Sequence, residues 1–208
     1  KLYFSSKKKA DCYLKDDIIY YNDEEVLDTN KMIIVGNHNK ENVMASIMVA
    51  KEFNVSNDTI RKVAYNFKGV EHRLEFSGEV DGVKYYNDTE ATNIKCTQIA
   101  LSSFNNPTII ILGGLERGQD FNELTPYMKN VKAVLAIGEC RKRVEDYAKS
   151  LKIPVYTHEF LKDAMKEIEG LKKSGDVVLL SPASASWDQY KECEIRGKEF
   201  KDFVKELK

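Results

Sequence analysis

Three short, continuously apolar runs constrain the fold of this chain most strongly. They are "TIIIL" from Thr108, "AVLAI" from Ala133 and "VVLL" from Val177. Such runs are typical of strands that are covered on both faces, as in a parallel sheet. Helical patterns separate them at the spacing of βαβ units, whose crossovers are right-handed. The sequence therefore predicts an α/β domain around a mostly parallel sheet.

A β-hairpin leads into this alternating region. Residues 74–88 have the pattern of two strands around Asp81-Gly82, a pair that suits a tight two-residue loop. After the hairpin, the spacing of apolar residues predicts helices and strands in alternation. The expected elements are a helix at 91–104, a strand at 107–112, a helix at 120–130, a strand at 131–137, a helix at 140–151, a strand at 153–157, a helix at 160–173, a strand at 176–181 and a last helix from about 187.

The first part of the chain predicts a smaller set of elements without a complete core of its own. A hairpin is expected at 10–21 and a strand at 31–36. A helix follows over 39–53, and a second begins after Ser56 or Asn57 as its cap. The apolar faces of the two helices are expected to be Val43, Ile47, Ala50 and Phe53, and Ile60, Val63, Ala64 and Phe67. We expect a domain boundary between Gly69 and Arg73, a segment that could also serve as a hinge.

Composition excludes several classes of function. The 208 residues are 42% hydrophobic and 31% charged, with a formal net charge of -1, so no basic surface for nucleic acid is indicated. No apolar run reaches the roughly 18 residues that a membrane span needs. The four cysteines form no C-x-x-C pair, and the three histidines share no metal-ligand spacing. We therefore expect a protein of the reducing cytoplasm, with no metal ligands and with no nucleic-acid or membrane partner. A monomer is also expected, although none of these features determines the oligomeric state.

Polar loops follow three of the predicted strands: "NDTEATN" at 87–93, "GGLERGQDF" at 113–121 and "SPASASWDQY" at 181–190. Ligands of parallel sheets bind beyond the carboxyl ends of the strands. Gly113 and Gly114 allow close backbone approach, and Arg117 can fork onto a carboxylate. Helix capping explains some of the hydroxyl groups in these loops but not all of them. The residues predict a site for a small anionic molecule.

The familiar catalytic motifs are missing from this sequence. It holds no G-x-x-x-x-G-K-[ST] loop, no G-x-G-x-x-G, no G-x-S-x-G and no H-E-x-x-H. From the residues alone, the chain is predicted to bind a small anion, and no catalytic residue is assigned.

Five ordered motifs resemble a known family. "GNHNKEN", "GVEHRLEF", "YYNDTEATN", "GGLERGQDF" and "LLSPASASWDQY", followed by "RGKEF", resemble the Mur ligases that add D-glutamate to UDP-N-acetylmuramoyl-L-alanine. That family has a UDP-binding domain, a central ATPase domain and a Rossmann-like C-terminal domain. The resemblance implies that residues 1–71 end the ATPase domain and that residues 72–208 form the Rossmann-like domain, which binds D-glutamate.

The resemblance also implies a reaction in cytoplasmic peptidoglycan precursor synthesis. ATP with Mg²⁺ would convert the alanine carboxylate to an acyl phosphate, which the amine of D-glutamate attacks. The family's phosphate loop, magnesium ligands and modified lysine would all precede Lys1. We therefore expect that these 208 residues alone do not catalyse ligation.

Site residues are assigned motif by motif from the resemblance. The positions implied for ATP binding are Asn39, Asn42, Arg73 and Asp88, and those implied for D-glutamate binding are Thr92, Arg117, Ser186 and Cys193.

Several of these motifs depart from the family's pattern. Arg117 stands where some members have lysine, and Cys193 where an aromatic residue is common; a backbone contact at 193 would survive that change. Ser184 replaces a common cysteine. Glu90 replaces the usual lysine, so it would repel an anionic substrate unless it turns away or pairs with a cation.

The sequence leaves two alternatives open. One is a related ligase, such as a folylpolyglutamate synthase, with another acceptor. The other is a non-catalytic binding module derived from a Mur ligase. "NDTEATN" and "SPASASWDQY" favour the D-glutamate-adding type over the first alternative.

Overall fold

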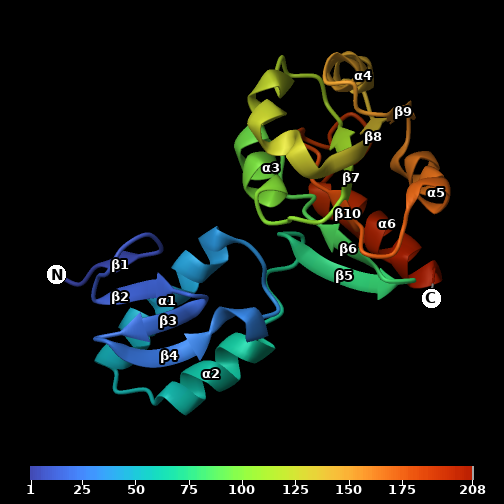
Figure 1. Ribbon diagram of the computed structural model, residues 1–208. Coiled ribbons are helices and arrows are strands. Elements are labelled where there is room, and N and C mark those ends of the chain that lie inside the picture. Colours follow the sequence, from blue (N-terminus) through green and yellow to red (C-terminus); the bar gives the residue numbers. More distant parts are fainter. Residues whose placement is uncertain (208) are drawn as a thin grey trace. The chain divides into compact units, whose positions relative to one another are not determined.

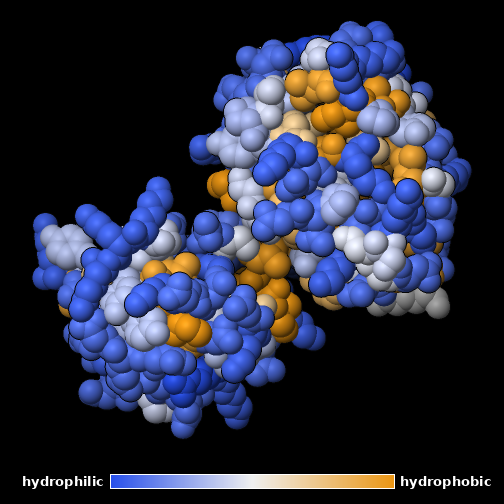
Figure 2. Space-filling view, in the orientation of Figure 1, coloured by the Kyte–Doolittle hydropathy of each residue, from blue (hydrophilic) through white to orange (hydrophobic). Residues whose placement is uncertain are grey.

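The computed structural model describes residues 1–207, and the chain forms two compact units (Figure 1). The first unit is Lys1–Gly69, and the second begins at Val70. Hydrophilic residues cover most of the visible face of each unit (Figure 2). Within the described residues, no helix is long and apolar enough to cross a bilayer.

The first unit is a four-stranded sheet packed against two helices. Its strands lie in sequence order: β1 (Phe4–Ser5), β2 (Cys12–Lys15), β3 (Ile18–Tyr21) and β4 (Glu24–Asp28). β1 and β2 are parallel, whereas the pairs β2–β3 and β3–β4 are antiparallel, so the hairpin expected at 10–21 is confirmed. The helices are α1 (Asn37–Glu52) and α2 (Asn57–Asn66), and Ser56 caps α2 by accepting from the Thr59 N–H at 3.3 Å.

Two expectations for this unit are wrong, and a third is right only in part. Residues 31–36 form no strand, because the Asp28 carboxylate accepts from the Asn30 N–H and starts a 3₁₀ turn, η1 (Thr29–Lys31), and Gly36 then enters α1 with φ +94°. The expected face of α1 is confirmed at Ile47, which is buried, and at Val43 and Ala50, which pack against the core. Phe53 does not belong to this face, because it is 78% exposed, and Met44 and Met48 are buried instead. The unit also has a core of its own, in which side chains from β2, β3, β4, α1 and α2 pack together.

The second unit is a six-stranded sheet in the order β5-β6-β10-β7-β8-β9. β5 pairs with β6 antiparallel, and every other neighbouring pair is parallel, which confirms the predicted fold class. Asp81 and Gly82 both have positive φ, as the predicted tight turn requires. The strands are β5 (Glu75–Val80), β6 (Val83–Asn87), β7 (Thr108–Gly113), β8 (Val131–Ile137), β9 (Val155–Thr157) and β10 (Val177–Leu180).

Helices cover both faces of this sheet, with α3 on one side and α5 and α6 on the other (Figure 1). Side chains of α5 and α6 pack with alternate strand residues such as Ile109 and Ile111 in one buried cluster. The helices are α3 (Ile94–Leu101), η2 (Phe121–Asn130, a 3₁₀ helix), α4 (Arg141–Ser150), α5 (Leu161–Leu171) and α6 (Cys193–Glu206).

The last helix begins at Cys193 rather than near 187. The Ser186 carbonyl accepts from the N–H groups of Gln189 and Tyr190, so the chain turns here before Glu192 leads into α6 in extended conformation. A long loop therefore separates β10 from α6.

The strand order determines where the loops meet. β10, the last strand in the sequence, lies between β6 and β7, and Leu180 is in register with Asn87 and with Ile111. The carboxyl ends of β6, β10 and β7 are therefore neighbours. The three polar loops of the sequence follow these three strands.

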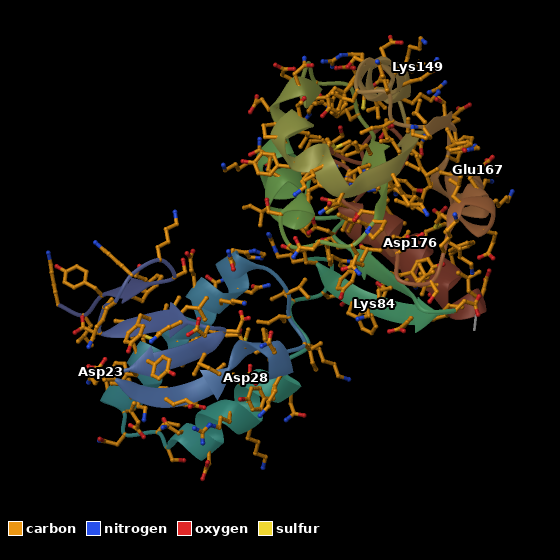
Figure 3. The ribbon with its side chains drawn as sticks, in the orientation of Figure 1. Asp23, Asp28, Lys84, Lys149, Glu167 and Asp176 are labelled. Carbon is orange, nitrogen blue, oxygen red and sulfur yellow. The ribbon has the colours of Figure 1, made fainter. Side chains whose placement is uncertain are left out.

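At the opposite ends of these strands, their amino ends, lies a buried carboxylate whose charge is balanced by a lysine. Asp176 is 3% exposed, and its carboxylate accepts from the Lys132 ammonium at 2.6 Å and from the Lys173 N–H at 2.7 Å. Its carbonyl also accepts from the Lys84 N–H at 3.0 Å, and both residues are labelled in Figure 3. These contacts anchor β10 at its amino end.

Gly113 ends β7 at a point where no other residue fits. Its φ is +118°, and a Cβ there would collide with the Ile137 carbonyl oxygen on β8. Gly113→Ala should lower the free energy of unfolding by about 2 kcal/mol or more. Urea unfolding followed by the fluorescence of Trp187, the one tryptophan of the chain, reports on this unit.

The matched control is Gly170→Ala in α5, where a new Cβ meets nothing within 4 Å. This change should leave stability unaltered or raise it by up to about 1 kcal/mol. A Gly113→Ala protein as stable as Gly170→Ala would contradict the packing described for β7 and β8.

Candidate ligand site

Backbone hydrogen bonds join the three loops at the carboxyl edge of the sheet. The Asp88 N–H donates to the Leu180 carbonyl at 2.8 Å, which attaches the loop after β6 to β10. On the other side, the N–H groups of Gly113 and Leu115 donate to the carbonyls of Pro182 and Ala185, each at 2.9 Å. The loop after β10 is thus held from both sides.

A buried arginine from α6 ties two of these loops together. Arg196 is 1% exposed, and its Nε donates to the Thr89 hydroxyl at 3.0 Å. Its Nη2 donates to the carbonyls of Thr89 and Ser184, each at 3.1 Å. Burial lowers the pKa of this guanidinium to about 10. Sequence reasoning missed this role, although Arg196 belongs to the quoted "RGKEF" motif.

Arg196 makes no salt bridge with any carboxylate in residues 1–207. Its direct partners are a hydroxyl and two carbonyl dipoles, so no carboxylate contacts this buried positive charge within the described residues. Asp188 acts on this charge only from a distance, without a direct contact, so the charge still favours an anionic ligand near these loops.

Asp88 links the hairpin corner to β10. It is 7% exposed; its Oδ1 accepts from the Leu74 N–H at 3.1 Å and its Oδ2 from the Ser181 hydroxyl at 2.7 Å. Burial raises the pKa of the carboxyl group to about 6, against the ordinary 3.8. Asp88 therefore has a structural role in joining these two segments. Its contact with ATP stays a prediction.

Glu90 pairs with a cation. This is one of the two arrangements, besides turning away, by which an acid at this position avoids repelling an anionic substrate. Its Oε2 lies 3.4 Å from Nη2 of Arg73, and its Oε1 accepts from the Cys193 thiol at 3.5 Å. Burial, with Glu90 nearby, raises the pKa of that thiol to about 11, so Cys193 is a protonated donor. The Cys193 carbonyl accepts from the Thr89 hydroxyl at 2.9 Å. The structure thus brings Arg73, Glu90 and Cys193 together.

The other residues predicted to bind D-glutamate are Arg117, Ser186 and Thr92, and their side chains carry hydrogen-bond donors that are available to a ligand. Arg117 is exposed, forms no salt bridge in the described part of the chain, and lies with its Cζ 4.8 Å from the Trp187 ring centroid. Ser186 is 1% exposed, yet its hydroxyl has no hydrogen-bond partner among the described residues. Asn93, not Thr92, caps α3 by accepting from the Cys96 N–H at 3.0 Å, so capping does not occupy Thr92.

Asn39 and Asn42 lie on α1 of the first unit. The Asn39 amide donates to the Val35 carbonyl at 2.8 Å, and Asn42 is exposed. Their role in ATP binding stays a prediction.

Neither acidic cluster of the described residues suits magnesium, which takes octahedral oxygen ligands. In the cluster of Glu71, His72 and Glu75, the Lys201 ammonium already binds both carboxylates, at 2.6 and 2.7 Å. The cluster of Glu90, Cys193 and Glu194 includes a thiol, and Arg73 pairs with Glu90.

A depression of about 700 Å³ in the second unit is not lined by any of the predicted site residues. Its walls carry four carboxylates against two cations, a balance that disfavours an anion. The charged lining residues are Glu139, Glu159, Asp188, Glu199, Arg141 and Lys162. The edge with Arg117 and Ser186 is therefore the better candidate.

Comparison with known proteins identifies the family. The family model described as "Mur ligase, glutamate ligase domain" matches residues 72–184. The chain therefore belongs to the Mur ligase family.

Two relatives are both named UDP-N-acetylmuramoylalanine–D-glutamate ligase. The protein from Oenococcus oeni is 42% identical over 205 residues, which is 98% of this chain and 47% of the relative. The protein from Bacillus subtilis is 45% identical over 197 residues, 94% of this chain and 44% of the relative. The chain thus spans less than half the length of these curated relatives.

Solved structures confirm the fold. UDP-N-acetylmuramate-alanine ligase from Thermotoga maritima has a TM-score of 0.68 at 16% identity, covering 100% of this chain and 48% of that chain. The MurF ligase from Thermotoga maritima in complex with ADP also has a TM-score of 0.68, at 19% identity, covering 100% and 49%.

The buried carboxyl group of Asp88 predicts an unusual pH dependence. Its pKa of about 6 lies above the unfolded value, so the native state binds the proton more tightly. The contribution of this group to stability should therefore rise as the pH falls from about 7 to about 4, on the order of 2 kcal/mol. Urea unfolding at each pH measures it, with Asp88→Asn as the reference that cannot titrate.

The difference in unfolding free energy, wild type minus Asp88→Asn, should grow toward low pH. Subtraction removes the opposite trend from acids whose pKa is lowered, such as Asp163 beside Lys166. A difference that stays constant between pH 7 and 4 would show that Asp88 is not buried in this way.

Proposed function

We propose that this chain forms the glutamate-binding part of an ATP-dependent ligase that adds D-glutamate to UDP-N-acetylmuramoyl-L-alanine. The enzyme would act as a monomer in the cytoplasm, in peptidoglycan precursor synthesis. Support comes from the two relatives of that name, which match nearly the whole chain at 42% and 45% identity. The observation that carries the proposal is the pair of unused donors, the Arg117 guanidinium and the buried Ser186 hydroxyl, at one sheet edge.

A dicarboxylate fits the chemistry of this edge. An arginine can bind one carboxylate through two parallel hydrogen bonds, and the Ser186 and Thr92 hydroxyls can donate to carboxylate oxygens. The charge of Arg196, which no carboxylate contacts within the described residues, adds favourable potential. At Cys193, the thiol and the carbonyl are both engaged within the fold, so this residue would mainly shape the wall.

ATP, when bound, supplies the phosphoryl group that activates the alanine carboxylate. The proposed contacts from this chain are Arg73 and Asp88 in the second unit and Asn39 and Asn42 in the first. Arg73 is 62% exposed at its side chain and so available to a phosphate, although it must share its charge with Glu90. We propose that the Mg²⁺ ligands lie outside residues 1–207.

A chimeric ligase tests this proposal. The chain would replace the matching C-terminal part of the Bacillus subtilis relative, with which it is 45% identical. We expect the chimera to incorporate labelled D-glutamate into UDP-N-acetylmuramoyl-L-alanine in an ATP-dependent reaction. Arg117→Ala should raise the KM for D-glutamate and lower kcat/KM by roughly 10²-fold, since a charge-assisted contact is worth about 2–3 kcal/mol.

Lys149→Ala is the matched control, because Lys149 is an exposed cation on α4 (Figure 3). It should leave both kinetic constants within about twofold of the parent chimera. A folded chimera that hydrolyses ATP but never ligates D-glutamate would contradict the proposal. An unchanged KM in Arg117→Ala would remove Arg117 from the site.

A further inference from the structure

Trp187 is the most unusual exposed residue of the candidate site. It is the chain's one tryptophan, it directly follows the buried Ser186, and it is 62% exposed. The Cζ atom of Arg117 lies 4.8 Å from the centroid of its ring. An indole that stays in water gains little hydrophobic stabilisation. Burial therefore does not explain why Trp187 lies against Arg117.

No other side chain in the described part of the chain holds the Arg117 guanidinium. Arg117 forms no salt bridge there, and only its backbone N–H is fixed, by donating to Gln119 Oε1 at 3.0 Å. The next residue, Gly118, has φ +70° and open space around it. Without Trp187, the long side chain of Arg117 would be free to sample many rotamers.

Stacking leaves the donors of arginine available. A guanidinium on an aromatic ring uses its flat face, whereas its five N–H groups point outward in its own plane. A carboxylate can therefore bind the edge of Arg117 in bidentate fashion while the face stays on the indole. A ring in this place orients the arginine without competing for its hydrogen bonds.

We infer that Trp187 is a positioning residue, whose ring holds the Arg117 guanidinium beside Ser186 to receive a carboxylate of the substrate. This inference rests on the proposed function, in which that substrate is D-glutamate. Trp187 is not a catalytic residue in this account, because it acts through Arg117.

The first test concerns the free protein. Nuclear magnetic resonance of the complete ¹⁵N-labelled chain should show the Arg117 Nε–H proton shifted by the ring current of the indole. Trp187→Leu should abolish that shift, and Trp187→Phe should keep a reduced one. An Arg117 signal that is the same in wild type and in Trp187→Leu would overturn the inference.

The second test concerns binding, with D-glutamate as the titrant of the same chain and L-glutamate as a comparison. Trp187→Leu should weaken D-glutamate binding by about three- to tenfold, and Trp187→Phe should restore it to within about twofold of wild type. Phe160→Leu is the matched control, because Phe160 is also an exposed ring under a cation, with Lys162 Nζ at 5.5 Å, outside the site. It should bind like wild type.

The outcomes separate the two claims. Equal binding by wild type and Trp187→Leu would overturn the positioning role and leave the proposed function intact. Loss of binding in Phe160→Leu as well would also overturn it, since the effect would not be specific to Arg117. A wild-type chain that binds no D-glutamate would contradict the substrate of the proposed function, and the inference would fail with it.

Discussion

The candidate site depends on one buried charge, the guanidinium of Arg196. It reaches from α6 to the loop after β6, through Thr89, and to the loop after β10, through Ser184. Each buried carbonyl that it binds would otherwise lose a hydrogen bond at a cost of about 1–3 kcal/mol. Because the charge meets dipoles rather than a carboxylate, the same residue that fixes the loops also makes their edge attractive to an anion.

Strand order is the second constraint. Residues near 88, 113 and 181 are far apart in the sequence, and they meet because β10 inserts between β6 and β7. The site is therefore complete only when the last strand has entered the sheet. The two ends of the strands then differ in chemistry. At the amino ends, Lys132 forms a salt bridge with Asp176, whereas at the carboxyl ends the side chains of Arg117 and Ser186 keep hydrogen-bond donors without a partner among the described residues. This asymmetry is what distinguishes a binding edge from a structural one.

The sequence predicted those features that local patterns determine. Apolar runs such as "TIIIL" identified the buried strands, and Asp81-Gly82 identified the hairpin turn. Features that depend on distant partners were missed. Residues 31–36 have the composition of a strand but no strand pairs with them, and Arg196 resembles any surface cation of a helix until its carbonyl partners are known. The stacking of Arg117 on Trp187 likewise joins residues 70 positions apart.

A crystal structure of the chain with D-glutamate tests the central claim most directly, that the loops after β6, β7 and β10 form a dicarboxylate site. The account predicts one carboxylate on the edge of Arg117, with its face still on Trp187, and a hydrogen bond from the Ser186 hydroxyl, which has no partner within the described residues. D-glutamate bound in the depression between Glu139 and Asp188, with the Ser186 hydroxyl unchanged, would contradict it.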